Sequence, residues 1–230
     1  MKNKNYKAII FDLDGTIADT GGDLSNAINL MLGSFGFAKK SREEILKHIN
    51  FGARAFVKGC LPDDLITLFD DSFLDEALSR YKKFYAEHYL EETKLYDGIA
   101  DLVRFLHENG VKMCVLSNKH EDMTKRIVGE LFDKNYFVEV VGGSITEHGS
   151  VRFPHKPEPD SALYLAERME VESYEILYIG DSDVDMKTAI NAGMFPLGVT
   201  WGYRAESVLV EAGARKIARS PREILEFIVV

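Results

Sequence analysis

Two aspartates, Asp12 and Asp14, stand two residues apart directly after the apolar run 8–11. Four apolar residues that end at an acid are typical of a strand buried on both faces, and Gly15-Thr16 predicts a sharp turn at its carboxyl end. An Asp-x-Asp spacing is common by itself, so its place in the chain matters more than the motif. In an open parallel sheet, ligands bind at the carboxyl ends of the strands. Two carboxylates at that position favour metal binding or covalent and acid/base chemistry.

Polar residues also follow later apolar runs of strand length. Ser117-Asn118 follows one run, Gly180-Asp181-Ser182 follows another, and Lys156-Pro157 precedes a segment with helical period. We expect these groups to meet the first two acids, because the carboxyl ends of parallel strands share one edge of the sheet.

Four acids at one edge would repel one another unless a cation lies among them. The acids are Asp12, Asp14, Asp181 and Asp185. Oxygen ligands with a partly hydrated shell suit Mg²⁺, so we expect this ion. The alternative is that the Asp and Ser residues only cap the helices that follow. Capping requires neither a lysine nor two acids on the first strand.

Apolar runs alternate with segments of helical period along most of the chain. This alternation predicts an α/β fold built on a parallel sheet. Ser220, Pro221 and Glu223 predict a final helix that begins with a capping box. The expected later strands are 111–116, 137–141, 176–179 and 195–200, and the expected helices between them include 102–106, 123–131 and 163–169.

A long insertion separates the first two expected strands by about ninety-five residues, far more than one crossover helix needs. Within it, 24–35 and 73–88 have helical period, and Ser41 to Glu44 forms a capping box. No strand pattern is visible in the insertion. We therefore expect two domains, a sheet domain of residues 1–18 and 95–230 and an all-helical domain of residues 19–94.

Composition excludes several classes of protein. The chain has 230 residues and a formal net charge of −9, which disfavours binding to nucleic acid because no basic stripe is available. No apolar segment of signal-peptide or membrane-spanning length is present, so we expect a cytoplasmic protein with no membrane partner. Cys60 and Cys114 are too few for a disulfide framework and are interpreted as structural. The six histidines, which show no paired ligand spacing, are interpreted as surface or cap residues: His48, His88, His107, His120, His148 and His155.

Four motifs in chain order resemble the signature motifs of the haloacid dehalogenase superfamily: Asp12-Leu13-Asp14-Gly15-Thr16, Ser117-Asn118, Lys156-Pro157 and Gly180-Asp181-Ser182-x-x-Asp185. The helical insertion resembles the cap of the subgroup that holds phosphoglycolate phosphatases, pyrophosphatases and β-phosphoglucomutases. The stretch 12–29 is most similar to phosphoglycolate phosphatase. The resemblance implies a Rossmann-like core with a helical cap. It also implies Mg²⁺-dependent hydrolysis of a small phosphorylated metabolite through an aspartyl-phosphate, by a monomer or homodimer.

The resemblance also implies a role for each acid. Asp12 would be the nucleophile and a metal ligand. Asp14 would protonate the leaving group and then deprotonate water, while its backbone carbonyl binds the metal. Asp181 would be a side-chain metal ligand, and Asp185 would orient the waters on the metal.

Ser117 and the amide of Asn118 would donate to the phosphoryl oxygens, and Lys156 would offset the negative charge. Lys119 is a rival to Lys156, but we interpret it as a solvated residue at the start of a helix. The stretch 143–155 before Lys156 is longer than the family pattern. In the cap, 50–56 resembles a substrate loop without its first glycine. Its Arg54 is a candidate partner for a substrate carboxylate or phosphate, or else an ordinary surface arginine.

Other functions remain open at this point. A phosphomutase of the β-phosphoglucomutase type or a pyrophosphatase would share these motifs, although the sequence after Thr20 disfavours the mutase. A non-catalytic phosphoacceptor domain would need no general acid, so Asp14 disfavours it. Asp14 disfavours a dehalogenase for the same reason.

Overall fold

The chain folds into two compact units. The computed structural model describes residues 6–49, 52–62, 70–132, 135–143 and 152–228. One unit comprises Met1–Ala18 with Leu95–Val230, and the other comprises Asp19–Lys94. The first is called the sheet unit and the second the helical unit.

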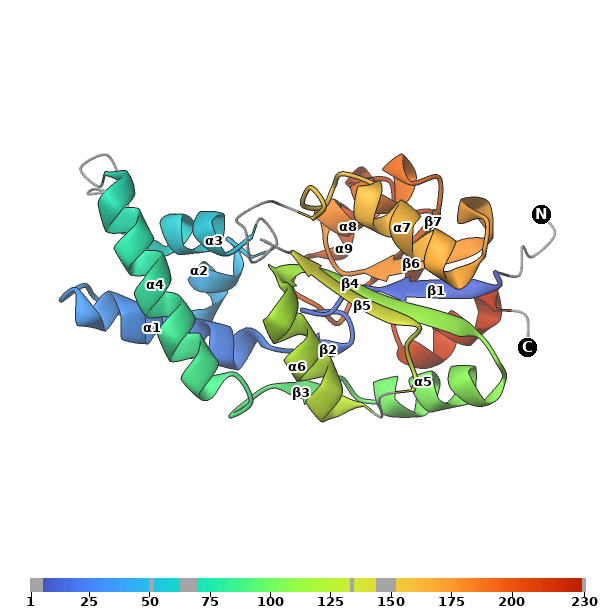
Figure 1. The fold of residues 1–230 in the computed structure, drawn as a ribbon, viewed down its shortest axis with the longest axis horizontal. Coiled ribbons are helices and arrows are strands. Elements are labelled where there is room, and N and C mark those ends of the chain that lie inside the picture. The colour runs from blue at the N-terminus through green and yellow to red at the C-terminus, as the bar shows by residue number, and fades with distance from the viewer. Residues whose placement is uncertain (1–5, 50–51, 63–69, 133–134, 144–151, 229–230) are drawn as a thin grey trace. The chain divides into compact units, whose positions relative to one another are not determined.

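The sheet unit contains a six-stranded sheet in which every neighbouring pair of strands is parallel (Figure 1). The order across the sheet is β5-β4-β1-β6-β7-β8. This topology confirms the predicted α/β class. The strands are β1 (Ala8–Phe11), β4 (Lys112–His120), β5 (Glu139–Gly143), β6 (Ile176–Gly180), β7 (Phe195–Val199) and β8 (Lys216–Ala218).

Strand β1 forms the centre of the sheet between β4 and β6. All four of its residues are fully buried, as expected for a strand covered on both faces. Phe11 is in register with Val115 on one side and Ile179 on the other. The chain therefore leaves these three strands at one level, which brings the polar residues that follow them to one place.

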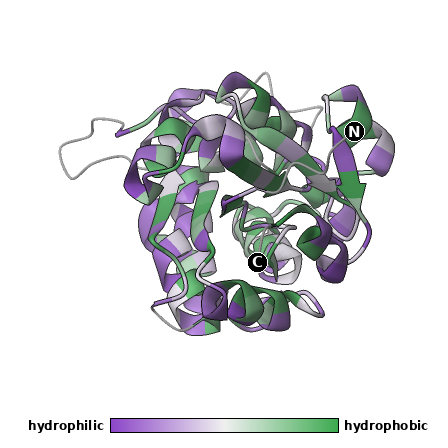
Figure 2. Ribbon diagram, turned by 90° about the vertical axis from the view of Figure 1, so that its right-hand side faces the viewer, coloured by the Kyte–Doolittle hydropathy of each residue, from purple (hydrophilic) through white to green (hydrophobic). Residues whose placement is uncertain are grey.

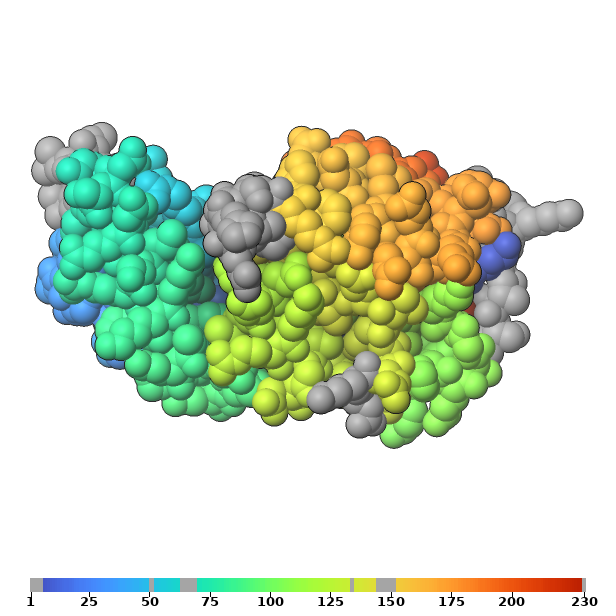
Figure 3. All heavy atoms as spheres, in the orientation of Figure 1, coloured from blue at the N-terminus to red at the C-terminus, as the bar shows by residue number. Residues whose placement is uncertain are grey.

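Helices cover both faces of the sheet (Figure 1). Leu165 and Met169 of α7 pack on Ala8, Ile10 and Cys114 in one buried cluster. Hydrophobic and hydrophilic residues alternate in bands along the helices in Figure 2, and in Figure 3 side chains of α6 and α7 form the surface beside the edge strand β5. These helices are α5 (Ile99–Glu108), α6 (Glu121–Leu131), α7 (Asp160–Met169), α8 (Asp183–Asn191) and α9 (Glu206–Glu211), with the 3₁₀ turn η1 (Ser173–Glu175).

The predicted final α-helix is wrong in type. Pro221–Phe227 forms a 3₁₀ helix, η2. Ser220 makes no side-chain cap, because its hydroxyl lies 3.2 Å from a carboxylate oxygen of Glu223 and donates to it instead of accepting a backbone amide. Strand β8 and helix α9 had no clear signal in the sequence.

The described residues of the helical unit form the helices α1 (Gly21–Ser34), α2 (Arg42–Leu46), α3 (Ala53–Cys60) and α4 (Asp71–His88). The capping box predicted at Ser41 is present. Buried Asp23 ties the two ends of the unit together, since its carboxylate accepts the amides of Glu92 and Thr93 at 2.9 and 2.8 Å. Two-residue strands, β2 (Ala18–Asp19) and β3 (Lys94–Leu95), pair where the chain passes between the units.

Both cysteines are free and buried, as their structural interpretation predicted. Burial raises the pKa of the Cys60 and Cys114 thiols to about 12, so neither is a reactive thiolate. No helix in the described parts of the chain is long and apolar enough to cross a membrane.

Gly142 of β5 gives a stability test of the sheet edge. A Cβ at this position would lie 2.4 Å from Cα of Glu121 and 2.7 Å from the carbonyl oxygen of Lys119. We expect Gly142→Ala to lower the free energy of unfolding by about 1–3 kcal/mol, measured by urea denaturation. The matched control is Gly129→Ala in α6, where a Cβ meets open space and helix propensity favours alanine by up to about 1 kcal/mol. Equal stability of the two variants would contradict this packing.

Candidate active site

The pairing of β4 with β5 is irregular after Leu116. Leu116 pairs with Val141 and His120 with Gly143, so four steps along β4 match two along β5. A register shift of this kind removes residues from the regular ladder and re-aims their side chains. Residues 117–119 occupy the shift, at the same end of the sheet as Asp12.

A tight turn after β1 sets the positions of Asp12 and Asp14. The carbonyl of Leu13 accepts the amides of Thr16, Ile17 and Ala18 at 3.3, 3.2 and 3.0 Å. Gly15 has φ of +89°, and a Cβ on it would lie 2.3 Å from Oδ2 of Asp181. Only glycine meets both requirements without strain, so the turn can press against the acid that follows β6.

Lys156 joins the acids of two different strand ends. Its ammonium lies 2.7 Å from Oδ1 of Asp12 and 2.7 Å from Oδ1 of Asp185, and it donates to the carbonyl of Leu116 at 3.2 Å. All three charged side chains are almost completely buried. The structure therefore brings together three residues that the sequence placed at one site.

Asn118 fixes the backbone of Lys156. Its side-chain oxygen accepts the amide of Lys156 at 2.8 Å, and its side-chain nitrogen donates to the carbonyl of Lys156 at 3.0 Å. The side chain of Asn118 thus holds the backbone of Lys156 in place. The sequence predicted a phosphoryl contact from the amide of Asn118, and the side-chain contacts with Lys156 are an additional role that it did not predict.

Asp181 and Asp185, which follow β6, are fixed by hydrogen bonds from neighbouring residues. The hydroxyl and the amide of Ser182 donate to Oδ2 of Asp185 at 2.5 and 3.1 Å in a capping box that starts α8. Oδ2 of Asp181 accepts the amide of Tyr203 at 2.6 Å, and Thr16 is 3.4 Å from Oδ1. Both carboxylates are fully buried.

Burial first, and then the crowding of negative charge, sets the electrostatics of this site. Burial, followed by the charge of Asp185, raises the pKa of Asp12 well above its usual range, and burial with Asp185 raises the pKa of Asp181 to about 7. Burial alone would lower the pKa of Lys156, but Asp12 and Asp185 outweigh it and hold that pKa well above its ordinary value. The ammonium therefore stays charged, and the carboxylates still have surplus negative charge.

The donor set fits a divalent metal. Asp12, Asp181 and Asp185 each offer a carboxylate oxygen within 4.8 Å of the other two, the one such group of potential ligands in the described part of the chain. Carboxylate oxygens together with surplus negative charge suit Mg²⁺. Asp12 and Asp181 belong to this group as predicted, and Asp185 joins it. The side chain of Asp14 does not, which leaves its backbone carbonyl as its predicted metal contact.

Lys119 corrects one interpretation of the sequence. Instead of being solvated at the start of a helix, its side chain is only 8% exposed, and its ammonium is 2.7 Å from Oδ1 of Asp14. Ser117 is 3.4 Å from Oδ2 of the same carboxylate. Strand β4 runs to His120, so Lys119 still belongs to the strand end. Its spacing of two from Ser117 was the signal that could have placed both side chains on one side.

Arg54 lies in the first turn of α3 within the helical unit. Its guanidinium pairs with Asp71, at 2.9 Å, and with Asp75, both on α4. The arginine therefore has structural partners, which the sequence interpretation as a substrate residue did not include. Asn50 and Phe51 of the predicted substrate loop, and residues 144–151 of the long stretch before Lys156, lie outside the described residues.

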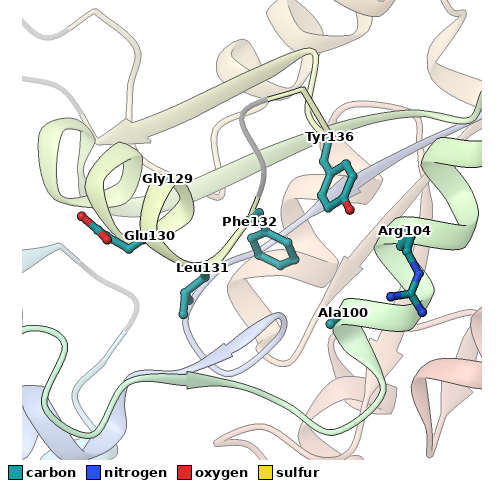
Figure 4. Close-up of a pocket in the computed structure, with 7 residues that line it drawn as sticks. All are labelled: Ala100, Arg104, Gly129, Glu130, Leu131, Phe132 and Tyr136. Carbon is teal, nitrogen blue, oxygen red and sulfur yellow. The ribbon is translucent and has the colours of Figure 1, made fainter.

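A surface pocket of about 380 Å³ lies elsewhere on the sheet unit (Figure 4). It lies between α5 and the C-terminal end of α6, and Arg104, Phe132 and Tyr136 line it with four other residues. None of the predicted site residues borders it, and Arg104 already pairs with Asp101. The buried acids and lysines, rather than this pocket, form the candidate active site.

The site residues lie within a region that matches the model of a known protein family. The model of the haloacid dehalogenase-like hydrolase family matches residues 9–199, which hold both acids of the first motif, Lys156 and the acids after β6. The chain belongs to this family. The predicted family is thereby confirmed, and the chain is an enzyme of the hydrolase class.

Relatives within the family are similar over the whole chain. A phosphoglycolate phosphatase of Vibrio parahaemolyticus serotype O3:K6 is 30% identical, with 100% of this chain and 99% of the relative covered. A phosphoglycolate phosphatase of Nitrosospira multiformis is 32% identical, with 96% and 95% covered.

A solved structure is similar to the same extent. The crystal structure of a candidate phosphoglycolate phosphatase from Lactobacillus delbrueckii subsp. bulgaricus is 29% identical. It has a TM-score of 0.86, with 98% of this chain and 99% of that chain covered. Its similarity agrees with the α/β fold of this family member.

Replacing Lys156 tests whether the buried acids depend on its charge. We expect Lys156→Met to lower the free energy of unfolding by about 3–5 kcal/mol in chelator, because Asp12 and Asp185 lose a buried partner. Urea denaturation measures the change. Lys187→Met, which breaks an exposed pair with Asp183, is the control and should cost no more than about 1 kcal/mol. A small loss at Lys156 would contradict the electrostatic account.

Proposed function

We propose that this hydrolase is a Mg²⁺-dependent phosphatase. Its substrate would be a small phosphorylated metabolite similar to 2-phosphoglycolate, hydrolysed through an aspartyl-phosphate on Asp12. The main support is the different surroundings of the paired acids. Asp12 contacts Lys156 among the potential metal ligands, whereas Asp14 lies with Ser117 and Lys119. These surroundings support attack by Asp12 and proton transfer by Asp14.

In the first step, a carboxylate oxygen of Asp12 attacks phosphorus. A bond forms between that oxygen and phosphorus, and the bond from phosphorus to the ester oxygen breaks. Asp14 gives its proton to the leaving ester oxygen, which departs as an alcohol. Asp14 becomes ionised, and Asp12 carries the phosphoryl group.

In the second step, ionised Asp14 takes a proton from a water molecule as the water oxygen attacks phosphorus. The bond between phosphorus and Asp12 breaks, inorganic phosphate leaves, and Asp14 again holds a proton. Ser117 and the backbone amide of Asn118 donate to the phosphoryl oxygens, and Lys156 offsets their charge. Asp12, Asp181 and the backbone carbonyl of Asp14 would hold Mg²⁺, which would supply positive charge beside Asp12 and the phosphoryl group. Asp185 would orient the waters on the ion.

The two acids should fail differently when replaced. Asp12→Asn removes the nucleophile, so turnover and the acid-stable, base-labile phosphoenzyme should both be lost. Asp14→Asn keeps the nucleophile, and kcat on 2-phosphoglycolate should fall by about 10²–10⁴-fold. Phosphate release and acid-quenched incorporation of labelled phosphate measure these effects. Near-normal activity of pure Asp12→Asn would overturn the covalent mechanism.

Removal of the metal tests the acid group. Chelation of Mg²⁺ should abolish activity, and Ca²⁺ should bind but support little turnover because its coordination is larger and looser. Asp181→Ala should weaken Mg²⁺ binding in calorimetry by at least about 10-fold, and more than Asp185→Asn does. Asp183→Asn is the control, since Asp183 pairs with Lys187 outside this group. Full activity in excess chelator would contradict the metal assignment.

The helical unit is proposed as the cap that selects the substrate, because the sheet unit supplies only phosphoryl and metal contacts. The similarity to phosphoglycolate phosphatases supports a substrate with a carboxylate, and Arg54 is the proposed partner of that group. Such a substrate would have to compete with Asp71 and Asp75 for the guanidinium.

Arg54→Ala separates recognition from support of the fold. If Arg54 meets the carboxylate, kcat/KM for 2-phosphoglycolate should fall roughly 10- to 100-fold, while p-nitrophenyl phosphate is almost unaffected. Asp75→Asn is the matched control, because it removes an intramolecular partner and leaves the arginine. Equal losses on both substrates with Arg54→Ala would assign it a structural role and favour pyrophosphate or a sugar phosphate. Monitoring isomerised product beside free phosphate detects a mutase.

A further inference from the structure

We propose that Lys119 is a positioning residue that holds the Asp14 carboxyl group in line with the leaving oxygen during the first step. This inference rests on the proposed phosphatase function. Its basis is the contact of 2.7 Å between the Lys119 ammonium and Oδ1 of Asp14, between two side chains that are each 8% exposed. A lysine that simply bound solvent or steered substrate would not need this burial.

Hydrogen bonds fix the backbone of Lys119, which limits the positions that its ammonium can reach. Its amide donates to Oγ of Ser117 at 3.1 Å, and its carbonyl accepts the hydroxyl of buried Thr124 at 3.1 Å. Gly142 packs so closely that a Cβ there would lie 2.7 Å from the same carbonyl. These contacts fix the residue at the end of β4.

Ser117 cannot donate the same proton to Asp14 and to a bound substrate. In the structure, Ser117 can donate to Oδ2 of Asp14 at 3.4 Å. A serine hydroxyl has one proton, so a Ser117 that donates to a phosphoryl oxygen no longer donates to Asp14. Of these two contacts, the one from Lys119 remains. Lys119 therefore still contacts Asp14 at the moment when this acid transfers a proton.

Asp12 and Asp14 contact different lysines. Lys156 contacts Asp12 and Asp185, and Lys119 contacts Asp14. If Lys119 acts through Asp14, its loss should matter in proportion to the leaving group's need for a proton. An alkoxide such as that of glycolate needs the proton, whereas p-nitrophenolate leaves as a stable anion. Leaving-group dependence thus separates positioning of Asp14 from contact with the phosphoryl group.

The test measures phosphoenzyme formation by rapid quench with saturating Mg²⁺, for 2-phosphoglycolate and for p-nitrophenyl phosphate. We expect Lys119→Met to slow this step about 10²-fold for 2-phosphoglycolate and less than about 3-fold for the aryl ester. Lys119→Arg, which keeps a charged donor, should recover most of the alkyl-ester rate. Lys125→Met, which breaks an exposed pair with Glu121, is the matched control and should behave as wild type.

A double-mutant cycle completes the design. In an Asp14→Asn background, adding Lys119→Met should change neither substrate's rate by more than about 3-fold, because the group it positions is gone. Equal losses on both substrates, or a full further loss in that background, would overturn the proposal and assign Lys119 to the phosphoryl group or the fold. Lys119→Gln gives the same readouts if the methionine variant does not fold. A wild-type enzyme inactive on every phosphate ester would instead remove the proposed function, and this inference with it.

Discussion

Repulsion among four carboxylates at one sheet edge is the constraint on which the site depends. Strands β1 and β6 bring the acids together because Phe11 and Ile179 are in register. Two buried lysines neutralise part of this negative charge. Lys156 pairs with Asp12 and Asp185, and Lys119 pairs with Asp14. Burial raises the pKa of Asp12 most, and the remaining negative charge raises it further. The same negative charge favours binding of a divalent cation at this edge of the sheet.

Asp12 and Asp14 have different surroundings at this crowded edge. Neighbouring acids on one strand end would have nearly the same chemistry if their surroundings were equal. Here one lies among potential metal ligands with Lys156, and the other lies outside that group beside Ser117 and Lys119. These different partners support the proposed two-step hydrolysis, in which Asp12 is the nucleophile and Asp14 the acid and base.

The sequence predicted the parts of the fold that depend on strong local patterns. The fully apolar run of β1 predicted a central buried strand, and the polar residues after the strands predicted one shared site. Lys119 was interpreted as a helix-start residue because the strand was expected to end before it, whereas β4 runs to His120 and the spacing of two from Ser117 was the available signal. The 3₁₀ form of η2 was missed because Ser220 and Glu223 suit two hydrogen-bond patterns, and the partners of Arg54 lie on another helix.

The most direct measurement of the central claim is the identity of the phosphorylated residue. The Asp14→Asn enzyme is mixed with p-nitrophenyl phosphate and Mg²⁺, quenched in acid, and treated with borohydride, which reduces an aspartyl-phosphate to homoserine. Peptide mass spectrometry then locates the reduced residue. The account predicts homoserine at position 12 and unmodified aspartate at 181 and 185. Homoserine at another position, or none during turnover, would contradict it.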